Sequence, residues 1–183
     1  RSKLKSIPVG YIVFDEVNEM NMKNIPLALE RTSGHDEVMA DFLSTPTVGG
    51  VGISVYYEDS TQNHYYFKCP HCSRQTELIF PDCLIVTAES INDPSIKNSH
   101  LICPDCKVKL DHASKTEWLS LSNAEWLPTK RGNVYQGFYI NQLYSMTSAC
   151  HPIKLAESFL RAQSDPTEEQ ELYNSKGGMT HEV

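Results

Sequence analysis

The sequence predicts an α/β fold in which a small β zinc ribbon is inserted into a larger sheet. Residues 9–14 form an apolar, β-branched and aromatic run that is typical of a buried strand. Two Cys-x-x-Cys hooks at 69–72 and 103–106 have the spacing of a ribbon. Over residues 152–163, apolar side chains recur at helical spacing, which predicts an amphipathic helix.

The first predicted strand ends in two acidic residues, Asp15 and Glu16. In P-loop ATPases an aspartate at this place holds the hydrated Mg²⁺ of MgATP, and in one branch the next glutamate polarises the attacking water. Because the chain turns just past a strand tip, both carboxylates can face a nucleotide. An ordinary strand end with two solvated charges is the alternative interpretation.

A second predicted strand follows a stretch of helical composition and ends in Ser44-Thr45-Pro46. Motor ATPases of the helicase type carry a small hydroxyl motif at this place, where it can sense the γ-phosphate and transmit its loss. The alternative is a local turn or helix N-cap made by the same serine and threonine.

The two hooks read Cys69-Pro-His-Cys72 and Cys103-Pro-Asp-Cys106. In each hook the proline fixes φ at about −65° at the start of a tight turn, so that both sulfurs converge. Two disulfides or a redox pair are alternatives, but no catalytic-thiol context surrounds either hook. The pattern therefore favours one structural zinc ion held by all four cysteines.

The zinc ribbon is predicted over residues 64–115, with each hook at the top of a β-hairpin. A unit of this size has little core, so the metal would supply much of its folding free energy. Residues 81–98, between the hairpins, are predicted to form a long mobile connection.

Beyond the ribbon, the aromatic-rich residues 118–144 are predicted to form strands and turns that return to the first sheet. The amphipathic helix at 152–163 comes next. Asp165-Pro-Thr-Glu168 then supplies an N-cap and a proline at the first helical position, so a second short helix should begin there. It should end before Gly177-Gly178.

Charge argues against a stand-alone nucleic-acid module, because 23 acidic residues outnumber 16 basic ones in the 183-residue chain. Within 64–115 the two signs balance, which favours a structural role for the ribbon over phosphate binding. Six cysteines, four of them in metal spacing, suit a reducing compartment. Cys83 and Cys150 are predicted to be buried or free thiols.

Taken in chain order, YIVFDE, LSTPT, YYFKCPHC, LICPDC, GFYINQLYS and Tyr173-Asn174 resemble the large subunit of tailed-bacteriophage terminases, in its zinc-bearing branch. The resemblance runs over nearly the whole chain. The paired hooks after a Ser-Thr-Pro strand are its most specific element. It implies a DNA-packaging motor that couples ATP hydrolysis to translocation of double-stranded DNA into a procapsid, while a separate nuclease domain cuts the concatemer.

For the fold, the resemblance implies the C-terminal half of a P-loop ATPase-type sheet over residues 1–63. The ribbon at 64–115 would be inserted there, and 116–183 would return to the ATPase domain and lead toward a nuclease domain. For the chemistry, it implies that Asp15 coordinates the Mg²⁺ of MgATP and that Glu16 activates water. Ser44, Thr45 and Pro46 would couple hydrolysis to movement.

The resemblance also implies Zn²⁺ and Mg²⁺ with ATP as cofactors. The implied partners are double-stranded DNA, a small terminase subunit, the portal and procapsid, and further copies of the chain, in the host cytoplasm and without a membrane. The sequence departs from the family because it contains no Gly-x-x-x-x-Gly-Lys-Ser/Thr loop. We therefore expect an internal fragment that is inactive alone, with nuclease residues beyond Val183. A non-catalytic zinc-ribbon interaction module and a helicase-like ATPase with a zinc insert are the alternatives.

Overall fold

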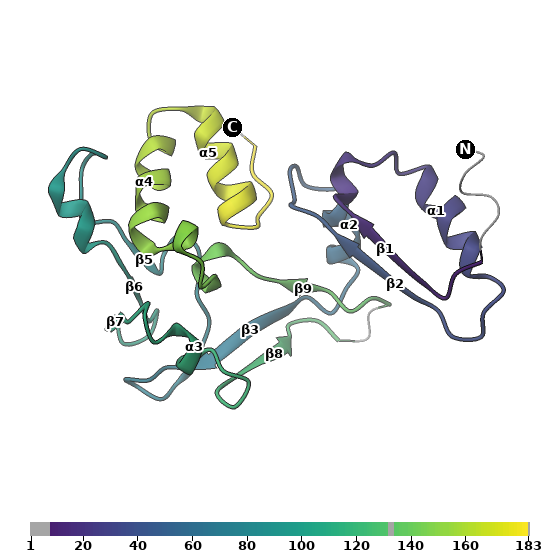
Figure 1. The fold of residues 1–183 in the computed structure, drawn as a ribbon, viewed down its shortest axis with the longest axis horizontal. Coiled ribbons are helices and arrows are strands. Elements are labelled where there is room, and N and C mark those ends of the chain that lie inside the picture. The colour runs from purple at the N-terminus through teal and green to yellow at the C-terminus, as the bar shows by residue number, and fades with distance from the viewer. Residues whose placement is uncertain (1–7, 132–133, 183) are drawn as a thin grey trace.

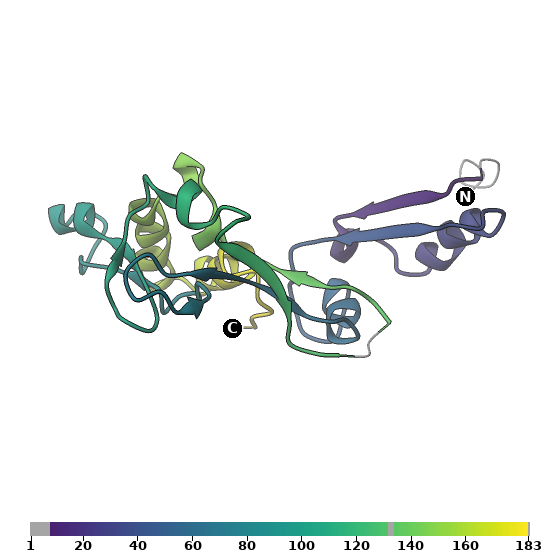
Figure 2. The ribbon, with the colours of Figure 1, turned by 90° about the horizontal axis from the view of Figure 1, so that it is seen from below.

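The computed structural model describes residues 8–131 and 134–182, and these form two parts on either side of the short helix α2 (Ile53–Glu58). Strands β1 (Tyr11–Asp15) and β2 (Met39–Leu43) extend away from the other sheets, as Figure 2 shows. All the remaining strands belong to the second, larger part (Figure 1).

In the first part, β1 and β2 pair in parallel, with Asp15 opposite Leu43. The connection between them contains α1 (Asn24–Leu29) and two 3₁₀ turns, Val17–Glu19 and Glu30–Thr32. One face of the two strands is packed, and there the rings of Phe14 and Phe42 stack with centroids 4.9 Å apart. The other face is about half exposed, with exposed fractions of 48–56% at Tyr11, Val13, Met39 and Leu43, and it also carries the acidic residues Asp15 and Asp41.

The predicted α/β class is confirmed among the described residues, and the strand before Ser44 lies where the sequence placed it. Two parallel strands do not establish a P-loop ATPase-type sheet by themselves, so that part of the fold stays a prediction.

The second sheet is built around β3 (Asn63–Lys68). It pairs antiparallel with β4 (Gln75–Thr76) and β8 (Ala124–Pro128), and parallel with β9 (Phe138–Tyr139). The aromatic stretch that we expected to return to the first sheet therefore joins β3 instead. Opposed aromatic side chains explain this pairing, because Tyr65 faces Trp126 with ring centroids 4.9 Å apart.

A third, antiparallel sheet has the order β5 (Leu84–Ile85), β6 (His100–Ile102) and β7 (Lys109–Leu110). Residues 81–98, which we predicted to be a mobile connection, supply β5 and the 3₁₀ turn Pro94–Asn98. Cys83, Leu84 and Ile96 are buried there, and Asp93 caps the turn by accepting from the Ser95 amide at 2.9 Å. Buried apolar side chains thus hold this segment in place.

Helix α3 (Lys115–Trp118) precedes β8, and two further 3₁₀ turns, Gln142–Tyr144 and Ser148–Cys150, lead to α4 (Pro152–Ala162). Helix α5 (Pro166–Glu171) continues into a π-helical turn, Leu172–Lys176. Both predicted helices are confirmed, and the Asp165 carboxylate caps α5 by accepting from the Thr167 amide at 2.9 Å. Among the helices of the described residues, none has the length and apolar character needed to cross a membrane.

The main hydrophobic core of the second part joins both of its sheets to the C-terminal helices, and a smaller cluster of Ile96, Ala156 and Leu160 lies between α4 and the Pro94–Asn98 turn. The most buried members of the main core include Phe67 on β3, Leu101 on β6 and Leu155 on α4, each no more than 1% exposed. The division into 1–63, 64–115 and 116–183 stays a prediction, but this core is continuous across the second of those boundaries. The cysteine-bearing hairpins therefore share their interior with the C-terminal helices.

A buried tyrosine hydroxyl forms hydrogen bonds with two backbone groups in this core. The Tyr144 hydroxyl accepts from the Leu78 amide at 2.7 Å and donates to the Tyr65 carbonyl at 2.6 Å. Burial raises the pKa of Tyr144 well above its ordinary value, so the hydroxyl keeps the proton it donates. The side-chain amide of Asn141 donates to the Leu78 carbonyl at 2.8 Å, so both backbone groups of Leu78 are bonded.

Tyr144→Phe should lower the free energy of unfolding by roughly 2–4 kcal/mol, because it leaves the buried Leu78 amide and the partly buried Tyr65 carbonyl without this partner. Urea unfolding followed by circular dichroism measures the change. Tyr66→Phe is the matched control, since the Tyr66 hydroxyl makes one 3.3 Å bond to Glu77 and is less buried. Equal losses of unfolding free energy in the two variants would contradict the role given to the Tyr144 hydroxyl.

Lys115 is the most buried charged residue among those described, at 1% exposure, and its ammonium donates to the carbonyls of Leu143 and Ser145 at 2.8 and 2.9 Å. Burial lowers the pKa of Lys115 to about 8 from an ordinary 10.5, although the nearby Cys150 acts in the opposite direction. Between these pH values the unfolded chain binds more protons than the folded one, so stability should rise with pH.

The expected slope from Lys115 is at most about 1.4 kcal/mol per pH unit. Urea unfolding of the wild type and of Lys115→Met at pH 8, 9 and 10 measures this slope. The difference between the two proteins isolates the contribution of Lys115, because the other groups titrate in both. The wild type should gain stability relative to the variant as the pH rises. A difference between the two proteins that does not change with pH would refute the burial effect.

Candidate functional site

The two motifs predicted to carry ATPase chemistry lie at the same end of the first sheet. Asp15 is opposite Leu43, so Asp15 and Glu16 leave β1 beside the point where Ser44 leaves β2. In open α/β sheets ligands bind outside the carboxyl ends of parallel strands. The side chains of Asp15, Glu16 and Thr45 are exposed at this end, whereas Ser44 and Pro46 are half-buried.

Glu16 has a left-handed backbone, with φ 55° and ψ 53°. This conformation is uncommon for a residue with a side chain and costs roughly 1–2 kcal/mol. It turns the chain immediately after β1, and the Glu16 carbonyl then accepts from the Glu19 amide at 2.9 Å. The turn expected just past the strand tip is therefore present, and strained backbone of this kind is concentrated at functional sites.

Asn18 ties this turn to two other segments. Its backbone amide donates to the Ser44 hydroxyl at 3.1 Å, and its side-chain amide donates to the Thr47 hydroxyl at 2.9 Å. Its side-chain oxygen accepts from the Ile53 amide, at the start of α2, at 2.8 Å. Sequence reasoning missed Asn18, because an asparagine in a turn is ordinary and its partners are distant in the chain.

The C-terminal segment reaches the same loop. The His181 amide donates to the Thr47 carbonyl at 3.1 Å. The His181 ring stacks on Tyr173 with centroids 4.4 Å apart, and its Nε2 lies 3.2 Å from a carboxylate oxygen of Glu169. The loop after β2 is thus bonded to the turn after β1 and to the end of the described chain.

The second predicted site is a four-cysteine centre. The sulfurs of Cys69, Cys72, Cys103 and Cys106 all lie within 4.8 Å of one another, and those of Cys69 and Cys106 are 3.9 Å apart. A tetrahedral ion with metal–sulfur bonds of about 2.3 Å would place its sulfurs about 3.8 Å apart. The four cysteines can therefore hold a metal ion, as the sequence predicted.

Both hooks have the same local geometry. Ser73 and Lys107 follow the second cysteine of each hook with φ of 58° and 60°. Their amides donate to the carbonyls of Cys69 and Cys103 at 2.9 and 3.0 Å. Neither residue is glycine, so each hook carries a conformational cost of roughly 1–2 kcal/mol, which metal binding can offset.

His71 lies outside the sulfur cluster. It is exposed, and its Nε2 is 3.1 Å from the Lys109 carbonyl on the other cysteine-bearing hairpin. It therefore links the two hairpins and leaves the four sulfurs as the set of potential ligands. Burial raises the pKa of the Cys103 thiol to about 12, so a thiolate at this position needs a nearby cation.

Cys83 and Cys150 are both buried free thiols outside this centre, as predicted. The Cys83 sulfur accepts from the Ile79 amide at 3.3 Å, and the Cys150 thiol donates to the Gln142 side chain at 3.2 Å. Burial also raises the pKa of Cys83, which keeps it protonated and unreactive. These contacts assign both residues to packing.

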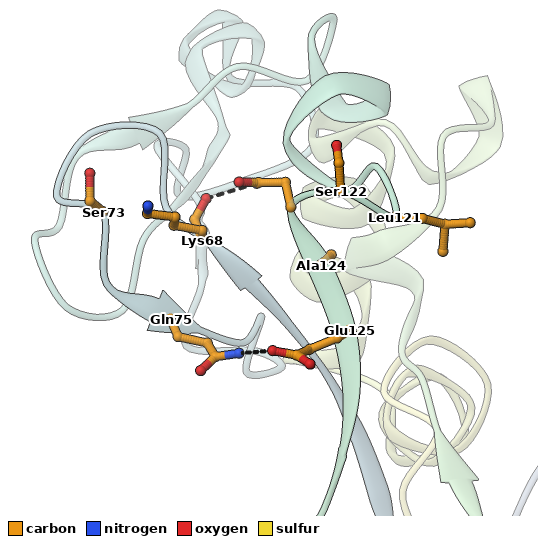
Figure 3. Close-up of a pocket in the computed structure, with 8 residues that line it drawn as sticks. Lys68, Ser73, Gln75, Leu121, Ser122, Ala124 and Glu125 are labelled. Atoms are coloured by element: carbon orange, nitrogen blue, oxygen red, sulfur yellow. Dashed lines mark hydrogen bonds between the residues drawn. The ribbon is translucent and has the colours of Figure 1, made fainter.

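A shallow groove of about 450 Å³ lies beside the first hook (Figure 3). Its walls include Lys68, Ser73 and Ser122, and the side chain of Gln75 donates to Glu125 at 2.7 Å across it. One basic and one acidic side chain give the groove no preference for phosphate. It does not include the residues at the ends of β1 and β2.

Comparison with known proteins gives one family. Residues 1–126 match the family model described as phage terminase large subunit gpA, ATPase domain. The matched span contains Asp15–Glu16, Ser44–Pro46 and all four cysteines of the centre. No curated protein and no solved structure matches the chain.

Metal analysis of the purified protein should find one ion per chain. Cys103→Ser removes a buried ligand and should reduce metal content strongly, whereas Cys150→Ser should retain it, because Cys150 is also a buried cysteine but lies outside the centre. Elemental analysis by mass spectrometry after exhaustive dialysis gives the stoichiometry. Equal metal loss in both variants would sink the assignment of the ligands.

Proposed function

The chain belongs to the phage terminase large subunit gpA family, whose ATPase domain its residues 1–126 match, and from that premise we propose that it couples ATP hydrolysis to translocation of double-stranded DNA. The family implies a phage DNA-packaging ATPase. The observation that carries the finer proposal is the meeting of two motifs, Asp15–Glu16 and Ser44–Pro46, at one end of β1 and β2. Such an end is where parallel sheets bind ligands.

In this proposal the exposed Asp15 carboxylate supplies a hard oxygen ligand for the Mg²⁺ of MgATP. Bound magnesium would neutralise charge on the phosphate groups. Glu16 acts as the general base, which orients a water molecule and accepts its proton. The left-handed backbone of Glu16 supports this role, because it turns the chain just past the end of β1. In the proposal, the nucleotide binds at this end of the strand.

Ser44, Thr45 and Pro46 are proposed to couple hydrolysis to movement. Their loop is bonded to the turn after β1 through Asn18, and to the C-terminal segment through His181. A change at the nucleotide could therefore move both neighbours of the loop. The exposed Thr45 side chain is free to respond to the γ-phosphate.

The four-cysteine centre is proposed to hold structural zinc, since four thiolates in two hooks are the ligand set of structural zinc sites. Two hairpins that belong to different sheets, β3–β4 and β6–β7, meet at this ion. The equal numbers of basic and acidic residues over 64–115 support a structural rather than a DNA-gripping role.

The family alone supports the remaining assignments. We propose that the protein acts in the host cytoplasm with double-stranded DNA, a small terminase subunit, and the portal of the procapsid. Several copies would form the motor, and a nuclease region would cut the DNA. The experiment below tests the catalytic proposal, and its failure would favour a non-catalytic role for these residues.

Glu16→Gln in the full-length terminase should lower the ATP hydrolysis rate by roughly 10²-fold or more, because the general base is lost. MgATP affinity should stay within a few-fold of the wild type. Asp15→Asn should instead weaken Mg²⁺-dependent nucleotide binding. Phosphate release and equilibrium binding of a fluorescent ATP analogue measure the two effects separately.

Glu19→Gln is the matched control, because Glu19 is an exposed acid in the 3₁₀ turn that follows Glu16. It should leave hydrolysis and binding unchanged. Wild-type hydrolysis by the Glu16→Gln protein would make Asp15 and Glu16 an ordinary solvated strand end.

A further inference from the structure

We infer that Asn18 is a positioning residue that holds the loop at Ser44–Thr47 in a fixed place relative to Glu16, and that Gly52 is its matched partner. The inference rests on the proposed ATPase function, because the turn and the loop are the proposed catalytic and coupling motifs. It adds two residues, Asn18 and Gly52, that no motif identifies. It also gives a physical route between the proposed catalytic turn and the proposed coupling loop.

Asn18 is suited to this role because it bonds three segments at once. Its backbone amide reaches the Ser44 hydroxyl, and its two side-chain atoms reach the Thr47 hydroxyl and the Ile53 amide. The side-chain NH₂ group of Asn18 donates to a hydroxyl oxygen, and its side-chain oxygen accepts from an N–H group. These two partners fix the orientation of the carboxamide. All three bonds are partly buried, at 2.8–3.1 Å.

The turn that carries Asn18 is itself anchored. Val17, between Glu16 and Asn18, is completely buried in the small core of the first part. The segment from Glu16 to Asn18 therefore pivots on a fixed apolar side chain. A displacement of Glu16 would reach the loop after β2 through the short, directional bonds of Asn18.

We call the contacts of Asn18 with Ser44, Thr47 and the start of α2 the junction, and Gly52 forms its α2 side. Its φ is 59°, and a Cβ at this position would collide with the Asn18 side chain, with the carboxamide carbon only 2.6 Å away. The N-terminus of α2 can approach Asn18 this closely only with glycine at position 52. Residues 18 and 52 are thus sterically matched although they lie far apart in the sequence.

The junction leads onward into the second part of the molecule. On α2, the Tyr56 ring stacks on Phe42 with centroids 4.4 Å apart, and the Tyr57 hydroxyl lies 3.2 Å from Nε2 of His64 on β3. The His64 Nδ1 in turn lies 2.7 Å from Glu77. Helix α2 therefore contacts the strand of the proposed coupling motif and the sheet that carries the first cysteine hook.

The test uses the full-length terminase and measures base pairs packaged per ATP hydrolysed, together with MgATP affinity and the thermal unfolding midpoint. Asn18→Ala should lower the packaging ratio roughly three- to tenfold, the factor expected for lost hydrogen bonds, with little change in MgATP affinity. Asn18→Asp should recover most of the ratio, because a carboxylate can accept from both the Ile53 amide and the Thr47 hydroxyl.

Gly52→Ala should reproduce the Asn18→Ala defect, because it displaces the same side chain from the other side. The double variant should be little worse than either single variant, since both remove one junction. Asn21→Ala is the control, because within the described part of the chain the Asn21 side chain accepts from the local Lys23 amide and reaches no other segment. It should package DNA at the wild-type ratio.

A wild-type packaging ratio in Asn18→Ala would overturn the inference, as would additive effects of Asn18→Ala and Gly52→Ala. A change in the unfolding midpoint with an unchanged ratio would reduce Asn18 to a structural residue. If Glu16→Gln loses hydrolysis while Asn18→Ala keeps its ratio, the inference fails and the proposed ATPase function stands. Normal hydrolysis in Glu16→Gln would instead remove the proposed function.

Discussion

The convergence of four sulfur atoms is the constraint on which the larger part of the structure depends. Three of the four strands that flank the hooks are short, since β4 and β7 have two residues each and β6 has three, which is too little for independently stable hairpins. Cys69 and Cys103 are buried members of the same core as Phe67 and Leu155. The four cysteines and the hydrophobic core therefore share one interior, so an ion bound by the sulfurs would stabilise the packing that joins the two small sheets.

The features that the sequence predicted are those encoded locally. The hooks, the N-cap at Asp165 and the strand that ends in Asp15 each depend on neighbouring residues, and the structure contains all three. The features that it did not predict depend on long-range pairing. Strand β8 could have paired with another edge, and its partner β3 is recognised by contacts across the sheet, such as the opposed rings of Tyr65 and Trp126.

The candidate site divides in the same way. Asp15 and Ser44 were found because each ends a recognisable strand, and their proximity follows from parallel pairing. Asn18 could not be found, because its significance lies in partners from separate loops that only the folded chain brings together. Residues that connect motifs carry less sequence signal than the motifs themselves, since many polar residues could occupy a turn.

The exposed face of the first sheet has a practical consequence for solution work. Parallel strands normally have both faces covered, and here Tyr11, Val13, Met39 and Leu43 are about half exposed on one face, which Asp41 interrupts by accepting a hydrogen bond from the Tyr11 hydroxyl. Exposed apolar side chains gathered on one face promote self-association. The apparent size of the isolated chain should therefore depend on its concentration, and dilution separates this self-association from any specific contact between copies of the chain.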